Sequence, residues 1–235
     1  MSSGAGPDGF PHVTVMPSEL PPVGSVIWMH GLGASGDDFV PLVPHMQLPD
    51  VRFVFPHAPV RKITAHGGWE MPAWFDLSSL GHSPDRENPV HVAESAERVQ
   101  ELVRSEMEQG IPSRSIVLAG FSQGAALALH AGNSCPEPLR GILVMSGYML
   151  MPKLFQRNFH PANKTTPMLF CHGERDLVVP YRRGRAAYRK CRTLHAHVEW
   201  MGFPVGHELC LEELHRIRAW LHLRFAAVRD ATRNT

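Results

Sequence analysis

The chain has 235 residues, of which 43% are hydrophobic and 19% are charged. This balance describes a globular chain and excludes disorder and coiled coil, and the length fits one large domain or two small ones at roughly 100 to 200 residues per domain. With 23 Lys and Arg against 22 Asp and Glu, the net charge of +1 provides no whole-chain attraction for nucleic acid or for an anionic membrane surface.

Short β-rich runs alternate with longer helical patterns along the chain, which indicates an α/β fold with a mostly parallel central sheet flanked by helices. The first run, 10–16, is expected to form an antiparallel edge strand. The other predicted strands are 24–29, 51–55, 115–119, 141–146, 167–171 and 197–201. We expect a single domain over 1–235, with its core at about 10–227 and flexible termini.

Two helices have clear sequence signals. The helix at 89–109 has Asn88 as a plausible N-cap, proline at its first position, and Gly110 after its end. The last helix, at 208–227, has apolar residues at helical spacing and is expected to pack against the sheet.

A long stretch with little periodicity lies between Pro56 and Asn88. A loop of this length in a compact domain is usually a lid or a binding loop. Its apolar content exceeds what a solvated loop requires: Trp69, Met71, Trp74, Phe75, Leu77 and Leu80. We therefore expect this stretch to act as a lid-like insertion.

Other sequence signals argue against a membrane protein, a secreted protein and a metal site. The longest apolar run, 141–145, is far shorter than the roughly 20 residues of a membrane span. Residues 1–10 lack the features of a signal peptide, and Ser2 replaces the glycine of a myristoylation motif. These features predict a cytoplasmic or nuclear location, of which we select the cytoplasmic one. The four cysteines form no C-x-x-C pair and the fifteen histidines no H-E-x-x-H, so we expect free thiols and no metal.

The strongest chemical signal is the G-x-S-x-G pattern around Ser122. It follows the predicted strand 115–119 and precedes an alanine-rich helical run, which is the strand–turn–helix setting of a nucleophile elbow. Glycines are required at both ends because the backbones approach too closely for a Cβ. Ser122 is therefore the predicted nucleophile.

A serine hydroxyl needs a base and an acid, which in this arrangement follow in the order Ser, Asp or Glu, His. Asp176 and His207 each follow a predicted strand and fit this order. Glu174 is a competing acid, but we favour Asp176 because it precedes an apolar segment, 177–179, expected to be tucked against the fold. His172 is a competing base that precedes the acid in the chain, so it is disfavoured.

Acyl transfer also needs backbone N–H groups that stabilise an oxyanion. The residue after the nucleophile, Gln123, is one candidate donor, and Leu32 in the glycine-rich loop 30–36 is the other. The alternative for this loop is a dinucleotide site, since Gly31, Gly33 and Gly36 fit G-x-G-x-x-G. That alternative lacks the acidic residue expected about 20 residues later, after a second strand.

Six ordered motifs together resemble the acyl-protein thioesterase and small carboxylesterase (lysophospholipase-like) family of α/β-hydrolases. The resemblance runs from about residue 22 to 222. The motifs are His30-Gly-Leu-Gly33, Phe55-Pro-His-Ala-Pro-Val-Arg61, Met71-Pro-Ala-Trp-Phe-Asp76, Gly120-Phe-Ser-Gln-Gly124, His172-Gly-x-x-Asp176 and Gly206-His207.

The resemblance implies a catalytic triad of Ser122, Asp176 and His207, with Leu32 and Gln123 as oxyanion donors. It also implies a lid around 71–80 that lines an acyl-binding channel, for which we select Trp74, Phe75, Leu77 and Leu80 as substrate-binding residues. Some members are homodimers. The chain departs from the family in having Ala34 after H-G-L-G, with Asp37 and Asp38 slightly later. Palmitoylated members carry a cysteine beside the initiator methionine, so Ser2 and Ser3 predict no anchoring by that route.

The expected reaction is acyl transfer to water, without metal or organic cofactor. The resemblance favours depalmitoylation of S-acylated cysteines on proteins, so the expected partners are acyl thioester or ester substrates, including lipidated proteins. A broad-specificity carboxylesterase or a lysophospholipase is the alternative. A non-catalytic lipid-binding module on a hydrolase scaffold is disfavoured, because drift would be expected to erase one of the five site positions.

Overall fold

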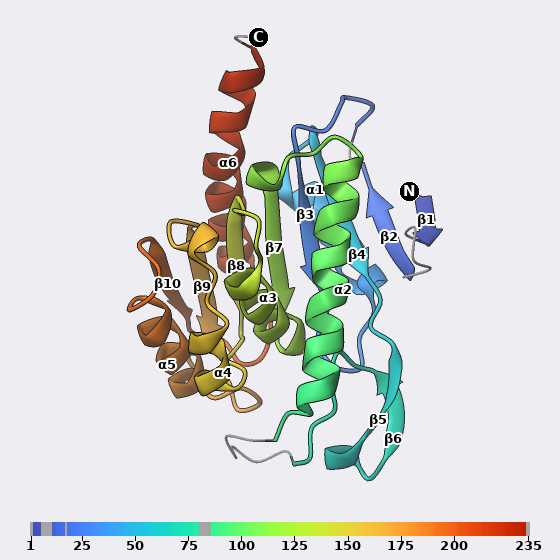
Figure 1. Ribbon diagram of the computed structural model, residues 1–235, viewed down its shortest axis with the longest axis vertical. Helices are drawn as coiled ribbons and strands as arrows, with labels where there is room; N and C mark the ends of the chain where they lie inside the picture. Colours follow the sequence, from blue (N-terminus) through green and yellow to red (C-terminus); the bar gives the residue numbers. More distant parts are fainter. Residues whose placement is uncertain (1, 6–10, 17, 80–85, 234–235) are drawn as a thin grey trace.

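The computed structural model describes residues 2–5, 11–16, 18–79 and 86–233, and it is built around an eight-stranded sheet (Figure 1). The strands are β1 (Ser2–Ala5), β2 (Pro11–Val15), β3 (Gly24–Met29), β4 (Val51–Pro56), β7 (Ile116–Phe121), β8 (Gly141–Met145), β9 (Met168–Gly173) and β10 (Val198–Phe203). Their order across the sheet is β1-β2-β4-β3-β7-β8-β9-β10. Neighbours from β4 to β10 are parallel, and β1 and β2 join in antiparallel pairing.

The predicted fold class is confirmed, and each of the six predicted parallel strands lies within two residues of its expected bounds. The expected antiparallel strand is β2, which pairs with β4. It was wrong to place this strand at the edge, because β1 pairs with its other side. Phe10, the first residue of that prediction, lies outside the described residues.

Helices cover both faces of the sheet. One face is covered by α2 (Pro89–Glu108), α3 (Gln123–Ser134) and α5 (Tyr181–Cys191), with α4 (Pro152–Arg157) packed beside α3. The other face is covered by α1 (Val43–Met46) and α6 (Leu211–Arg233). Side chains alternate along each strand, so β3 contributes to both cores. Within the described ranges, no helix is long and apolar enough to cross a bilayer.

The sequence signals predicted helix α2 accurately, placed the end of the last helix too early and missed helix α5. Asn88 caps α2 as expected, and its side-chain oxygen accepts hydrogen bonds from the N–H groups of Val90 and His91. The last helix begins at Leu211 and continues to Arg233, beyond its predicted end. Helix α5 was not predicted, because it is rich in arginine and its buried stripe consists only of the small residues Gly184, Ala187 and Cys191.

The stretch between Pro56 and Asn88 contains a hairpin that the sequence analysis missed. Strands β5 (Val60–Ile63) and β6 (Trp69–Pro72) pair antiparallel as a separate two-stranded sheet. Trp69 is exposed on this hairpin, whereas Ala73, Trp74 and Phe75 directly after it are fully buried. The stretch therefore combines a projecting hairpin with a segment of the core.

The parallel strands bring the predicted site residues to one edge of the sheet. Strand β3 ends just before the loop 30–36, and β7 ends just before Ser122. Strands β9 and β10 end shortly before Asp176 and His207. In an open α/β sheet, the carboxyl ends of the strands form the edge where ligands bind.

An acidic residue is buried near the start of α6. Glu213 is fully buried, and neither carboxylate oxygen has a hydrogen-bond partner within the described residues. Burial raises the pKa of this carboxyl from 4.5 to about 8, and the nearby Cys210 backbone offsets only a small part of that rise. The folded protein therefore favours neutral Glu213 at neutral pH.

We expect Glu213 to make folding stability fall as pH rises from about 5 to 8. In that window the unfolded chain loses the Glu213 proton while the folded chain keeps it, so the free energy of unfolding should decrease by on the order of 1 kcal/mol per pH unit from this group. This loss of folding stability is absent below the unfolded-state pKa of Glu213 and complete above its folded-state pKa. Urea unfolding of the wild type and Glu213→Gln at pH 5.5, 7 and 8 measures this effect. Parallel pH dependences in the two proteins would contradict it.

Candidate active site

Ser122 occupies a sharp turn between β7 and α3. Its backbone has φ 55° and ψ −116°, a conformation that non-glycine residues rarely adopt. A Cβ at Gly120 would collide with the carbonyl of Gly124, and a Cβ at Gly124 would collide with the carbonyls of Met29 and His30. The requirement for both glycines was therefore predicted correctly, and its cause is the close approach of the β3, β7 and α3 backbones.

A hydrogen-bonded chain connects Ser122, His207 and Asp176. The Ser122 hydroxyl donates to His207 Nε2 at 2.8 Å, and His207 Nδ1 donates to Asp176 Oδ2 at 2.7 Å. The other carboxylate oxygen of Asp176 accepts from the N–H groups of Val178 and Val179 at 2.9 and 2.8 Å. Every member of the chain therefore has a partner that holds its orientation.

The environment of Asp176 keeps it ionised. Burial opposes its ionisation, but the hydrogen bond and the charge of His207, with the backbone hydrogen bond from Val179, together hold its pKa below the ordinary value. Glu174, the competing acid, is exposed, and the His207 Nδ1 that a triad acid must bind is paired with Asp176. The geometry thus pairs His207 with Asp176.

Our reason for favouring Asp176 over Glu174 was nevertheless wrong. We expected the segment 177–179 to be tucked against the fold, but the side chains of Leu177 and Val178 are 91% and 62% exposed, and only Val179 is buried. The backbone of this segment matters more than its side chains, because its N–H groups bind the Asp176 carboxylate.

His172, the competing base, supports the same turn. Its Nε2 donates to the Val179 carbonyl at 2.8 Å and lies 3.5 Å from Asp176 Oδ2. The side chain is buried, and burial lowers its pKa despite the nearby carboxylate, so the neutral form predominates. Its hydrogen bond to Val179 stabilises the turn that carries Asp176.

Leu32 and Gln123 present backbone N–H groups near Ser122. Gln123 is the first residue of α3, where N–H groups have no partner within the helix. Within the described part of the chain, neither N–H has a hydrogen-bond acceptor. Both residues line the same cavity as Ser122. Two unsatisfied donors at the cavity wall are suited to bind a substrate oxygen.

Trp74 connects the Ser122 turn to the glycine-rich loop. Its backbone N–H donates to Gln123 Oε1 at 2.8 Å, and the Gln123 amide donates to the Phe75 carbonyl at 2.8 Å. The indole N–H of Trp74 donates to the His30 carbonyl at 2.8 Å. The Ser95 hydroxyl on α2 donates to the Trp74 carbonyl at 2.5 Å. Through Trp74, these buried hydrogen bonds connect the Ser122 turn, the glycine-rich loop and helix α2.

His30 and backbone groups hold the loop itself. His30 is fully buried, and burial lowers its pKa, which favours the neutral ring. Its Nδ1 donates to the Gly31 carbonyl at 2.7 Å, and its Nε2 accepts from the Ala58 N–H at 3.0 Å. The N–H of Gly33 donates to the Pro72 carbonyl at 2.8 Å. The loop is therefore held on both sides of Leu32.

The family's acidic position after H-G-L-G, occupied here by Ala34, is replaced in part by a later carboxylate. Asp38 accepts a hydrogen bond from the Ser35 N–H at 2.7 Å. The loop then enters a short 3₁₀ helix, Gly36–Leu42, that contains Pro41. A dinucleotide site would need the start of a longer helix at this point, so the loop geometry disfavours that alternative.

Ser122 and His207 lie in the wall of a cavity of about 430 Å³. Its apolar lining consists mainly of Leu32, Phe39, Leu77, Phe121, Val178 and Val179. Of the predicted substrate-binding residues, Leu77 lines this cavity, and Leu80 lies outside the described residues. Trp74 and Phe75 are fully buried and do not line it. Their packing and hydrogen bonds support the wall from behind.

One part of the cavity wall is charged, and sequence reasoning missed it. Arg86 and Tyr148 line the cavity together. Arg86 binds Glu87 at 3.1 Å, and the guanidinium of Arg183 lies 4.1 Å from the centre of the Tyr148 ring. Burial, and after it the charge of Glu87, raises the pKa of Tyr148 well above its ordinary value. The position of Tyr148 shortly after β8, at the carboxyl edge of the sheet, was the signal that could have identified it.

Among the described residues, no three His, Cys, Asp or Glu side chains are grouped to hold a metal ion.

The sequence profile of the Phospholipase/Carboxylesterase family matches residues 11–224. The chain belongs to this family. It is 35% identical to acyl-protein thioesterase 1 of Gibberella zeae over 218 residues, which cover 88% of this chain and 93% of that relative. The family predicted from the six motifs is thereby confirmed.

Solved structures agree with this assignment. Arabidopsis thaliana SOBER1 matches with a TM-score of 0.80 and 28% identity, covering 86% of this chain and 99% of that one. Zea mays acyl-protein thioesterase 2 also matches with a TM-score of 0.80, at 25% identity, covering 91% of this chain and 98% of that one. The chain is a serine hydrolase of the esterase and thioesterase class.

We expect Trp74→Phe to lower kcat for ester hydrolysis about tenfold with little change in KM, since loss of one buried hydrogen bond to the His30 carbonyl should misplace the Leu32 donor. Trp28→Phe is the matched control, because Trp28 is equally buried and its indole N–H has no partner within the described residues. Steady-state kinetics with a p-nitrophenyl ester measures the effect. Equal kcat in Trp74→Phe and Trp28→Phe would show that the Trp74 indole bond does not position the loop.

Proposed function

We propose that this serine hydrolase cleaves long-chain acyl thioesters, with S-palmitoyl cysteine in proteins as its principal substrate, through a triad of Ser122, His207 and Asp176. The observation that carries the proposal is the continuous hydrogen-bonded chain of these three side chains, at 2.8 and 2.7 Å, beside an apolar cavity. Relatives that cover most of the chain are named acyl-protein thioesterases, which supports the substrate class.

In the proposed reaction, the Ser122 oxygen attacks the thioester carbonyl while His207 Nε2 takes the hydroxyl proton. The ionised Asp176 holds His207 in the tautomer with the proton on Nδ1 and stabilises the imidazolium that forms. Collapse of the tetrahedral intermediate breaks the carbon–sulfur bond, and the His207 proton goes to the departing cysteine sulfur. The product is an acyl ester on Ser122.

Water completes the cycle by the same steps. His207 takes a proton from water, the resulting hydroxide attacks the acyl ester, and the proton returns to Ser122 as the fatty acid leaves. In both halves, negative charge develops on the carbonyl oxygen. The N–H groups of Leu32 and Gln123 are the proposed donors to this oxygen, and the hydrogen bonds of Trp74 and His30 keep them in position before the substrate arrives.

The apolar wall of the cavity supports an acyl chain as the recognised group. Phe39, Leu77, Val178 and Val179 line the space beside Ser122. Each methylene removed from water contributes about 0.8 kcal/mol, so several carbons in this space would provide substantial binding free energy. The apolar lining therefore favours acyl chains over polar substituents.

Hydrolysis of shorter carboxylic esters is the second candidate, and one observation favours it. Arg86 and Tyr148 form a polar part of the cavity wall, and an acyl chain cannot extend past buried charged groups without a cost in their solvation. A series of acyl chain lengths therefore distinguishes the two candidates.

Ser122→Ala should abolish both fluorophosphonate labelling and hydrolysis of a palmitoyl thioester. Asp176→Asn should lower kcat by roughly 10⁴, since the wrong histidine tautomer would be held. Glu174→Gln is the matched control, because Glu174 is two residues away and exposed, and it should change kcat little. Rates on a palmitoyl thioester with circular dichroism of each variant test these expectations. A large loss in Glu174→Gln with a mild one in Asp176→Asn would move the acid to Glu174.

Leu77→Ser should weaken hydrolysis of long acyl chains selectively, because it replaces apolar wall by a hydroxyl. We expect about a tenfold loss in kcat/KM on C16 thioesters and little loss on C4. The matched control is Leu102→Ser: Leu102 is 6% exposed and Leu77 7%, but Leu102 packs in the core and does not line the cavity. A C4 to C16 series measures the effect. Equal losses at all lengths in Leu77→Ser would place the acyl chain elsewhere.

A further inference from the structure

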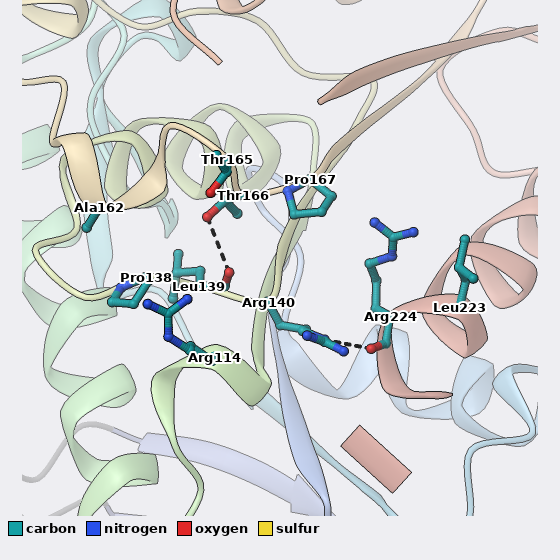
Figure 2. Close-up of a pocket in the computed structure, with 10 residues that line it drawn as sticks. All are labelled: Arg114, Pro138, Leu139, Arg140, Ala162, Thr165, Thr166, Pro167, Leu223 and Arg224. Carbon is teal, nitrogen blue, oxygen red and sulfur yellow. Dashed lines mark hydrogen bonds between the residues drawn. The ribbon is translucent and has the colours of Figure 1, made fainter. Parts of the chain in front are cut away.

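A second cavity, of about 350 Å³, lies at the opposite end of the sheet from Ser122 (Figure 2). Its lining includes residues just before three strands: Arg140 and Pro167 directly precede β8 and β9, and Arg114 lies two residues before β7. Helix α6 closes it with Leu223 and Arg224. The cavity is therefore at the amino ends of the strands, whereas the candidate active site is at their carboxyl ends.

The arginines of this cavity have no carboxylate partners within the described residues. No aspartate or glutamate is among the described residues that line the cavity, and none pairs with Arg140 or Arg224 elsewhere in the described chain. Half-buried arginines in other places do have such partners: Arg52 binds Glu106, and Arg229 binds Asp50.

Arg140 and Arg224 keep most of their hydrogen-bonding capacity unused. Arg140 Nε donates to the Arg224 carbonyl at 2.6 Å, and the terminal N–H groups of Arg140 have no acceptor among the described residues. The Arg224 guanidinium lies 5.2 Å from the centre of the Trp220 ring, and its buried Nε has no hydrogen-bond partner within the described residues. A buried donor without a partner is costly unless a ligand satisfies it.

The two cations also repel one another. Burial lowers the pKa of Arg140, and the charge of Arg224 lowers it further. Figure 2 shows Arg140 extended to the backbone carbonyl of Arg224, while the Arg224 side chain runs from there to a guanidinium that lies between Pro167 and Leu223 in this view. Arg114 lies apart from this pair, beside Pro138. Two of the three arginines that line the cavity are thus on the side where α6 lies.

We propose that this cavity binds a small phosphate monoester, with Arg140 and Arg224 as the ligands of the phosphate group. A phosphate dianion matches the two guanidinium charges, and guanidinium groups bind phosphate oxygens through paired hydrogen bonds. Leu139 and Leu223 provide apolar surface for the organic part of the ligand. The site is separate from Ser122, and its existence does not depend on the proposed thioesterase activity.

Calorimetric titration of the full chain with phenyl phosphate at pH 7.5 and low salt tests the site. We expect saturable binding that Arg140→Gln and Arg224→Gln each weaken about tenfold or more, since each removes a charge-assisted contact. Arg216→Gln is the control, because Arg216 is an exposed arginine on the same helix that does not line the cavity. Arg140→Lys keeps the charge but loses the planar fork, so it should bind with intermediate affinity. Thermal unfolding verifies that each variant is folded.

Two further measurements identify the ligand chemistry. Because the second phosphate pKa is about 6, binding should weaken several-fold at pH 5.5, and benzoate should bind more weakly than phenyl phosphate at pH 7.5. Phosphatidylcholine vesicles with and without phosphatidylinositol 4-phosphate test a lipid headgroup as the source. If the chain binds the vesicles with phosphatidylinositol 4-phosphate but not phenyl phosphate, and Arg140→Gln and Arg224→Gln lose that binding, the phosphate site is supported with a lipid as its ligand. No binding to either probe, or equal weakening by Arg216→Gln, would overturn the proposal.

Discussion

The close contact of three backbone segments at Ser122 is the constraint on which the rest of the site depends. The absence of a Cβ at Gly120 and Gly124 lets the end of β7 and the start of α3 approach the carbonyls at the end of β3. The same contact forces Ser122 into a positive φ, at a cost of about 1 to 3 kcal/mol. In return, the serine hydroxyl and the glycine-rich loop after β3 have a defined separation before any substrate binds.

Gln123 extends this constraint from the backbone to the surrounding structure. Within the described residues its backbone N–H has no acceptor, while its side-chain amide bonds at both ends to the backbone of Trp74 and Phe75. The Trp74 indole then bonds to the carbonyl of His30, two residues before Leu32. Such bonds are stronger in a buried, low-dielectric environment, and a missing partner there is costly. This network therefore couples the positions of the two candidate oxyanion donors.

The stretch between Pro56 and Asn88 illustrates how an apolar composition can have two causes. Its aromatic and aliphatic residues led us to expect an acyl-binding surface. Trp74 and Phe75 are instead core residues that hold neighbouring elements, and Leu77 alone among the described candidates lines the cavity. Burial of a side chain in the core and burial against a ligand require the same residue types, so composition cannot separate them.

The sequence by itself determined the fold class, the six parallel strands, the capped helix α2 and the order of Ser122, Asp176 and His207, because these depend on local periodicity, caps and short motifs. Only the tertiary structure decided that His207 contacts Asp176 and that Glu174 points to solvent, since two carboxylates two residues apart are equivalent in any local pattern. It also determined helix α5, the Trp74 network and the polar wall at Arg86 and Tyr148. Each of these depends on contacts between residues far apart in the chain, and such contacts form only when the strands are aligned in the sheet.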